Sequence, residues 1–309
     1  MGRSSSLRVT YSDIGDQDGA VILFCGGLFG SRYTLAHADE LAKRYRVRLV
    51  SPDKPGIGGS DPVELDQKLK TWLDVVPALM KELGVKHVSL VGHSSGAIYI
   101  LNTLLYLRDI LQPERPYAAV ITPWVHPSRS GVTESRIGEL LPGWALKLRY
   151  SFVHALSRYK ISSALGPSTA RPGVEVDKDR AEWELDNAIM SYAHEEDVEG
   201  IAQEALFCLK RGPEHMWGQW KDYDEYVPLL KKQEAEKKQA PKLSVEIFFA
   251  ESDNSSGEQG SKWFDECWKT SGIQDHVHST SCTIPGTTHE NITRMEAGVI
   301  ESIFSRVTR

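Results

Sequence analysis

Short apolar runs alternate with stretches of helical periodicity over the first part of the chain. Strands are predicted over 7–14, 21–24, 47–50, 87–91 and 117–121, and helices over 33–44, 69–83 and 97–107. The helical stretches place apolar residues three or four positions apart, whereas the strand segment 7–14 alternates as an edge strand does. Continuous apolar strands separated by helices are typical of a parallel sheet that is covered on both faces. The pattern therefore predicts an α/β fold.

This alternation stops after residue 121 and resumes only near residue 243. The intervening part is helical in pattern, interrupted by prolines, and ends in a charged stretch at 231–238. Since a structureless loop of this length is improbable inside a compact domain, we expect a helical subdomain over 125–239. Strand and helix patterns then continue at 243–250, 261–270, 277–284 and 292–307. The predicted organisation is a core of 1–124 and 240–309 with an inserted cap of 125–239.

The motif at residues 92–96, which reads GHSSG, lies between a predicted strand and a predicted helix. Ser94 has a glycine two residues away on each side, whereas Ser95 does not. A serine on such a tight strand-to-helix turn needs small neighbours at this spacing, because the strand and the helix cross there. The motif thus predicts a nucleophile elbow that presents the hydroxyl of Ser94.

A serine hydroxyl becomes a good nucleophile only beside a base, which in turn is oriented by an acid. His289 lies in a loop after the last predicted strand and is our candidate base. Asp253 and Glu251 both end the strand predicted at 243–250, at the sheet edge where the reactive groups of α/β sheets gather. We favour Asp253, which lies further into the loop. The position after Ile121 offers no carboxylate.

The chain order of Ser94, Asp253 and His289 is that of the α/β-hydrolases. Two further segments resemble family motifs: 24–30, FCGGLFG, is similar to the H-G-G-x-x-G oxyanion turn, and 52–61 is similar to the P-D-x-P-G-x-G-x-S loop. The chain therefore resembles an α/β-hydrolase with a helical cap over nearly all of 7–120 and 241–309. The segment 123–128 is similar to that of fungal members.

This resemblance implies further site residues. The backbone N–H groups of Gly27 and Ser95 are expected to form the oxyanion hole, with Leu28 as an alternative donor. Leu28 and Trp124 are expected to contact the substrate. Cys25 stands where the family usually has a histidine. That histidine commonly forms structural hydrogen bonds, so its loss need not impair the chemistry but leaves the geometry of the oxyanion turn open.

Composition and charge narrow the function classes. The chain has 309 residues, of which 40% are hydrophobic and 25% charged, and a net charge of −6. This acidic balance argues against a nucleic-acid surface. Four scattered cysteines form no pattern that indicates a disulfide framework or a metal site, and no run approaches the ~18 apolar residues of a membrane span. We expect a cytoplasmic protein with a small-molecule substrate and no cofactor or metal, and the oligomeric state stays open.

The leading hypothesis is a serine hydrolase that cleaves an ester, thioester or lactone of a fairly apolar small molecule. The tryptophans of the segment 125–239 favour a roomy apolar pocket between cap and sheet. A C–C bond hydrolase, or a non-hydrolytic enzyme that catalyses a retro-aldol or cyclisation step, would use the same site. A ligand receptor on this fold is a third hypothesis, although a pure binder has no need of all three catalytic groups.

Overall fold

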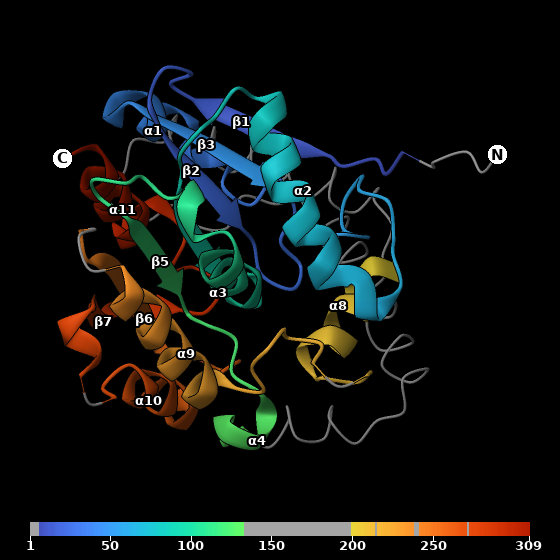
Figure 1. Ribbon diagram of the computed structural model, residues 1–309, viewed down its shortest axis with the longest axis vertical. Coiled ribbons are helices and arrows are strands. Elements are labelled where there is room, and N and C mark those ends of the chain that lie inside the picture. The colour runs from blue at the N-terminus through green and yellow to red at the C-terminus, as the bar shows by residue number, and fades with distance from the viewer. Residues whose placement is uncertain (1–5, 133–198, 214, 238–240, 271) are drawn as a thin grey trace, which may run out of the picture.

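The computed structural model describes residues 6–132, 199–213, 215–237, 241–270 and 272–309 (Figure 1). Most of the segment predicted as a cap, including Trp144 and Trp183, lies outside these ranges. Within them, no helix is both long enough and apolar enough to cross a membrane.

The described residues contain one seven-stranded sheet, with the strand order β1-β3-β2-β4-β5-β6-β7. Its strands are β1 (Tyr11–Gly15), β2 (Ala20–Cys25), β3 (Val47–Pro52), β4 (Ser89–His93), β5 (Tyr117–Ile121), β6 (Leu243–Ser252) and β7 (Val277–Thr288). All neighbouring strands are parallel except β1, which pairs antiparallel with β3 at the edge. The α/β fold expected from the sequence is confirmed.

Helices cover both faces of this sheet (Figure 1). They are α1 (Asp39–Tyr45), α2 (Lys68–Glu82), α3 (Gly96–Tyr106), α4 (Pro127–Ser130), α8 (Glu199–Cys208), α9 (Tyr223–Glu236), α10 (Gly257–Cys267) and α11 (Val299–Thr308), with short 3-10 turns at Ala36–Ala38, Leu65–Gln67, Arg108–Ile110, Ile273–Asp275 and Met295–Ala297. α1 and α11 pack on one face of the sheet, and α2, α3, α9 and α10 pack on the other.

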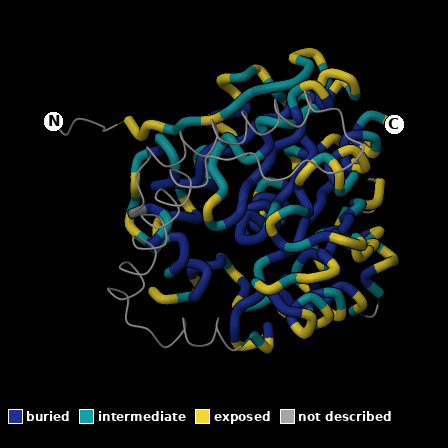
Figure 2. Tube along the Cα trace, turned by 180° about the vertical axis from the view of Figure 1, so that it is seen from behind, coloured by how far each residue is buried: buried dark blue, intermediate teal, exposed yellow. Residues whose placement is uncertain are grey.

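Each central strand supplies side chains to two apolar clusters. In β2, Ile22 and Phe24 join the cluster formed with α1 and α11, whereas Leu23 and Cys25 join the cluster formed with α2 and α3. This division follows from the two-residue period of a strand, and it explains why β2 contains no polar face. Figure 2 shows the buried residues gathered along the middle of the molecule.

Two predicted helices, and the strand predicted over 7–14, begin later in the structure than the sequence pattern indicates, the strand at Tyr11. The predicted helix 292–307 begins only at Val299, because Asn291 folds back so that its Oδ1 accepts a hydrogen bond of 2.7 Å from the N–H of Thr288. Gly298, with φ of 71°, then separates this turn from α11. The predicted helix 33–44 is likewise a 3-10 turn followed by the short helix α1.

α9 and α8 lie in the stretch that the sequence analysis assigned to the cap. α9 packs beside α10, and the Tyr226 hydroxyl donates a 2.9 Å hydrogen bond to the carbonyl of Leu101 in α3. Phe207 of α8 also belongs to the cluster on this face of the sheet. The part of this stretch that contains α8 and α9 is therefore anchored to the sheet face that carries α3.

The turn between β4 and α3 is strained and tightly enclosed. Ser94 has φ of 53°, a left-handed conformation that costs a residue with a side chain roughly 1–2 kcal/mol. Its N–H donates to the carbonyl of Ile121 at 2.9 Å, and its own carbonyl accepts from the N–H of Trp124 at 3.1 Å. A Cβ atom at Gly96 would overlap the carbonyl oxygen of Cys25, and one at Gly92 would lie 3.0 Å from Ala97. The predicted nucleophile-elbow geometry is thus present.

The glycine requirement at Gly96 can be tested by Gly96→Ala. We expect this variant to lose roughly 3 kcal/mol of unfolding free energy in urea denaturation, because the added methyl group forces the backbone of β2 and α3 apart. Gly84→Ala is the control, since Gly84 has φ of 66° but no atom within 4 Å of the added Cβ. It should lose only the roughly 1–2 kcal/mol of left-handed strain. Equal losses would contradict the crossing argument.

A second prediction concerns the buried ion pair that ties α9 to the end of α3. Arg108 Nε donates to Glu234 Oε1 at 2.6 Å, and the pair is bidentate and almost fully buried. Glu234→Leu should lower the unfolding free energy by roughly 3 kcal/mol, because it strands a buried guanidinium, whereas the double variant with Arg108→Met should recover most of the loss.

The matched control for this pair is Asp109→Asn. Asp109 accepts from Lys237 at 3.0 Å between the same two parts of the chain, but its side chain is exposed. Its loss should change the unfolding free energy by less than about 1 kcal/mol. A double variant as unstable as Glu234→Leu would contradict the interpretation.

Candidate active site

Ser94, Asp253 and His289 come together beyond the carboxyl ends of β4, β6 and β7. Ser94 Oγ lies 2.8 Å from His289 Nε2, and His289 Nδ1 lies 3.0 Å from Asp253 Oδ1. The three side chains are largely buried. The loops that follow parallel strands all leave the same edge of the sheet, which is how positions 195 residues apart reach one point.

The hydrogen bonds define the tautomer of the imidazole. An ionised carboxylate has no proton to donate, so the proton lies on Nδ1 of His289 and is donated to Asp253. Nε2 is then unprotonated and accepts the hydrogen bond from the Ser94 hydroxyl. This arrangement can withdraw a proton from Ser94 when its oxygen attacks an electrophile.

The surroundings of Asp253 favour its ionised form. Burial alone would raise the pKa of Asp253, but the hydrogen bond from His289 and those from the N–H groups of Ser256 and Ser255 hold this pKa below its ordinary value. Glu251, the alternative acid, is exposed and accepts from the N–H of Gly286 at 2.9 Å. The structure therefore brings Asp253, and not Glu251, to the imidazole.

The glycine loop after β2 lies directly against the elbow. A Cβ atom at Gly27 would be 2.9 Å from Ser94 Cβ and 3.4 Å from Ser94 Oγ, so only a glycine allows this approach. Within the described part of the chain, no hydrogen-bond acceptor is found for the N–H groups of Gly27, Leu28 or Ser95. These three donors lie where the sequence analysis expected an oxyanion hole.

His93, the variable residue of the elbow, packs against the candidate base. Its Nε2 lies 3.1 Å from the carbonyl oxygen of His289, to which it donates, and the two rings are 5.4 Å apart. Burial, followed by the nearby His289, lowers the pKa of His93 to about 3. His93 is therefore a neutral donor that holds the backbone of His289.

Trp124 is held in place beside the elbow. Its indole N–H donates to the carbonyl of Cys208 at 3.2 Å, and its own carbonyl accepts from the Tyr223 hydroxyl at 2.8 Å. The side chains of Trp124 and Leu28 are both partly exposed, and both belong to loops that contact Ser94. These positions suit the substrate contacts expected for them.

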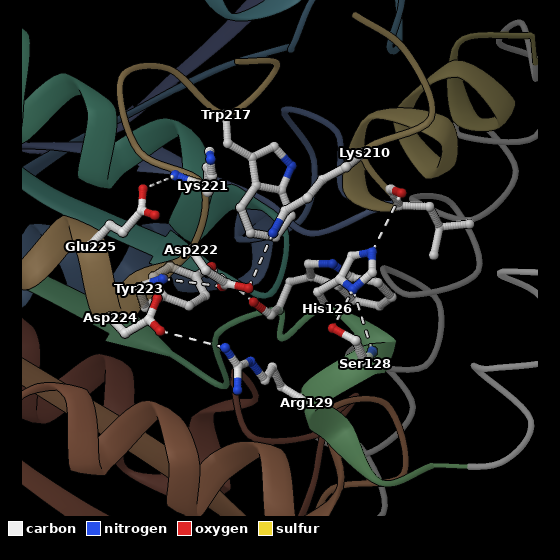
Figure 3. Close-up of polar contacts among 12 residues, drawn as sticks. His126, Ser128, Arg129, Lys210, Trp217, Lys221, Asp222, Tyr223, Asp224 and Glu225 are labelled. Atoms are coloured by element: carbon white, nitrogen blue, oxygen red, sulfur yellow. Dashed lines mark hydrogen bonds and ion pairs between the residues drawn. The ribbon is translucent and has the colours of Figure 1, made fainter. Parts of the chain in front are cut away.

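A polar network fixes the loop that follows α8 (Figure 3). Lys210 Nζ lies 3.2 Å from Asp222 Oδ2 and 3.8 Å from the centroid of the Trp217 ring. His126 Nδ1 accepts from the N–H of Ser128 at 3.3 Å and caps α4. His126 Nε2 also lies 3.4 Å from the carbonyl oxygen of Leu209, and Arg129 Nη2 lies 3.5 Å from Asp224 Oδ2, so these contacts join the start of α4 to the end of α8 and to α9.

The sequence analysis missed a buried charged cluster under the glycine loop. It consists of Lys54, Lys68 and Glu204, and Lys54 contacts the carbonyls of Gly26 and Gly27. Lys54 could have been identified from the sequence, because it occupies the variable third position of the motif at 52–61. No local pattern marks Glu204, which comes from α8.

Across the described ranges, no three His, Cys, Asp or Glu side chains lie close enough together to hold a metal ion. The polar groups gathered at the elbow are a hydroxyl, an imidazole, a carboxylate and backbone N–H donors.

Comparison with solved structures shows the same fold in several hydrolases. A carboxylesterase of the thaumarchaeon Nitrososphaera gargenis aligns over 99% of this chain and 97% of its own, with a TM-score of 0.63 and 12% identity. An enol-lactonase from Burkholderia xenovorans aligns over 98% and 97%, with a TM-score of 0.61 and 15% identity. A Bacillus megaterium epoxide hydrolase aligns over 98% of both chains, with a TM-score of 0.57 and 15% identity.

No curated protein gives a significant sequence match. The sequence profile of the alpha/beta hydrolase family, however, matches residues 22–261, which include the glycine loop, the elbow and Asp253. With the sheet order, the elbow and the family profile in agreement, the chain belongs to the alpha/beta hydrolase family and is a hydrolase of that family.

Proposed function

We propose that this hydrolase cleaves an ester, thioester or lactone of a fairly apolar small molecule through an acyl-enzyme on Ser94. The observation that carries the proposal is the continuous hydrogen-bonded chain from Ser94 Oγ through His289 to Asp253, with contacts of 2.8 and 3.0 Å. A hydroxyl is activated as a nucleophile when an imidazole beside it can accept its proton and a carboxylate orients that imidazole.

The proposed reaction begins when Ser94 Oγ attacks the substrate carbonyl carbon and its proton passes to His289 Nε2. Asp253 stabilises the imidazolium that results, and the N–H groups of Gly27 and Ser95, or Leu28, bind the carbonyl oxygen as it becomes negative. The bond to the leaving group breaks, and His289 returns the proton to the departing oxygen or sulfur. Water then attacks the acyl-enzyme with the same assistance, and Ser94 regains its proton.

Support for carbonyl substrates comes from the site and from two of the similar structures. The solved relatives include a carboxylesterase and an enol-lactonase, whose names state activity on ester and lactone bonds. The partly exposed Leu28 and Trp124 beside Ser94 offer apolar contacts to the acyl or alcohol group. We further propose that the protein acts in the cytoplasm on a small molecule and not on nucleic acid, in keeping with its net charge of −6.

A first test is covalent labelling of the nucleophile. A fluorophosphonate probe should label the wild-type protein once, and peptide mapping should find the label on Ser94, because the activated oxygen displaces fluoride. Ser94→Ala should abolish labelling and lower the hydrolysis of p-nitrophenyl esters by roughly 10⁶-fold. Ser95→Ala provides the neighbouring control and should still be labelled. Unlabelled but folded wild-type protein would refute the nucleophile.

The identity of the acid is tested by a pair of amide variants. Asp253→Asn should reduce kcat by roughly 10⁴-fold, because an amide cannot stabilise the imidazolium or hold its tautomer. Glu251→Gln should stay near wild-type activity, since Glu251 bonds only the exposed backbone at Gly286. Steady-state kinetics that show the reverse order would make Glu251 the acid.

C–C bond hydrolysis would use the same three residues, so it is distinguished from ester hydrolysis by the substrates that the protein turns over. Burst kinetics with p-nitrophenyl esters of increasing chain length would show acyl-enzyme formation followed by slower deacylation. Turnover of 1,3-diketones with no turnover of any ester would favour C–C cleavage. Ligand binding without multiple turnover of either class would favour the receptor hypothesis.

A further inference from the structure

Three charged side chains are buried together beneath the glycine loop. Lys54 is 1% exposed, and Lys68 and Glu204 are 0% exposed. Lys54 Nζ lies 3.0 Å from Glu204 Oε1, and Lys68 Nζ lies 3.3 Å from Glu204 Oε2. The Tyr99 hydroxyl donates a further 2.8 Å bond to Glu204 Oε2. Burying an ion costs several kcal/mol unless each charge finds good partners, so this cluster requires an account.

The partners of Lys54 are unusual for a structural lysine. Its ammonium donates to the carbonyl of Gly27 at 2.6 Å and to that of Gly26 at 3.1 Å, and it lies 3.3 Å from Ser95 Oγ. Gly27 and Ser95 are the residues whose N–H groups are the proposed oxyanion donors. The buried ammonium of Lys54 therefore contacts both of the residues whose N–H groups are the proposed oxyanion donors.

Because the peptide group is planar, these contacts also determine the direction of the N–H groups that follow the two carbonyls. No described peptide bond is cis, and in a trans peptide group the C=O and the following N–H point in opposite directions. Because the carbonyls of Gly26 and Gly27 point at Lys54, the N–H groups of Gly27 and Leu28 point away from it. Gly27 is also the residue that contacts Ser94.

We propose that Lys54, held by Glu204 of α8, is a positioning residue that orients and polarises the two peptide groups of the oxyanion loop. The inference rests on the proposed function, because it assigns Lys54 a part in stabilising the oxyanion of that reaction. A cation behind a carbonyl draws electron density from its peptide group and makes the attached N–H a stronger donor. The same positive charge favours the negative oxygen that forms in front of the loop.

The electrostatics of the cluster keep the ion pair charged. Burial opposes charge on both groups, but the attraction between them holds the pKa of Glu204 below, and that of Lys54 above, its ordinary value. Lys68 differs, because burial lowers its pKa despite the same carboxylate. Lys54 is also the nearer of the two cations to the carboxylate of Glu204, at 3.0 Å compared with 3.3 Å for Lys68.

The cluster also answers the question raised by Cys25. This residue stands where the family usually has a histidine, and its thiol reaches only a weak contact of 3.9 Å with the carbonyl of Gly26. Burial raises the pKa of the Cys25 thiol to about 12, so it carries no charge that could fix the loop. Lys54 supplies a charged anchor at the same carbonyl.

Lys68 offers a matched control. It is equally buried and shares Glu204, but its ammonium donates to the carbonyl of Pro55 at 2.6 Å, outside the glycine loop. Lys54→Met and Lys68→Met therefore each remove one buried ammonium from the same carboxylate. Only the first removes the contacts to Gly26 and Gly27.

The experiment compares kcat and KM for a p-nitrophenyl ester in the two variants. Lys54→Met should lower kcat by about 10²- to 10³-fold, as the loss of one oxyanion donor does, with little change in KM. Affinity for a trifluoromethyl ketone, which forms a tetrahedral oxyanion on Ser94, should fall in parallel with kcat. Lys68→Met should stay within about tenfold of wild type in both measurements.

A structural role is distinguished by comparing the two single variants, because each leaves Glu204 paired with the one remaining lysine. The unfolding temperatures of Lys54→Met and Lys68→Met should therefore fall by similar amounts, while kcat and ketone affinity fall only in Lys54→Met. Equal kcat and ketone affinity in the two variants would overturn the positioning role. If Lys54→Met does not fold, Lys54→Gln takes its place, and the same equality with Lys68→Met would overturn the role.

The wild-type protein separates this inference from the proposed function. Fluorophosphonate labelling of Ser94 and turnover of the ester are measured first. If the wild type fails both, the proposed function fails. If it passes both, the variants test Lys54 alone.

Discussion

The close crossing of the start of α3 over the end of β2 is the constraint on which the site depends. Gly96 lies so near the carbonyl of Cys25 that no side chain fits between them. This contact brings the elbow and the glycine loop together, and the left-handed backbone of Ser94 follows from the turn required to reach α3. The strain is tolerated because two backbone hydrogen bonds and a buried core surround it.

The sheet supplies the rest of the geometry. In a parallel sheet, the loops that follow the strands all leave the same edge. Ser94 after β4, Asp253 after β6 and His289 after β7 therefore meet although they are far apart in the sequence. Ser255 and Ser256 then hold Asp253, and His93 holds the backbone of His289. The site is therefore supported by groups from the loop after β6 and from the end of β4.

The buried carboxylate of Glu204 connects α8 to this support. Ser95 and Glu204 are 109 residues apart, yet Ser95 Oγ donates to Glu204 Oε1 at 3.3 Å. Since neither the carboxylate nor the two ammonium groups would be tolerated alone in this interior, the placement of α8 and the shape of the glycine loop depend on each other.

Sequence alone determined most of the elements and singled out Ser94 as the candidate nucleophile, because strand and helix periods and the spacing of Gly92 and Gly96 around Ser94 are local features of the chain. The position of His289 in a loop after the last predicted strand was enough to select it as the candidate base. Tertiary structure decided between Asp253 and Glu251, since both end β6 and only the direction of the backbone there turns one carboxylate toward the imidazole. It alone also revealed Lys54 with Glu204, because a contact between distant segments depends on how the helices pack and leaves no periodic trace in either segment.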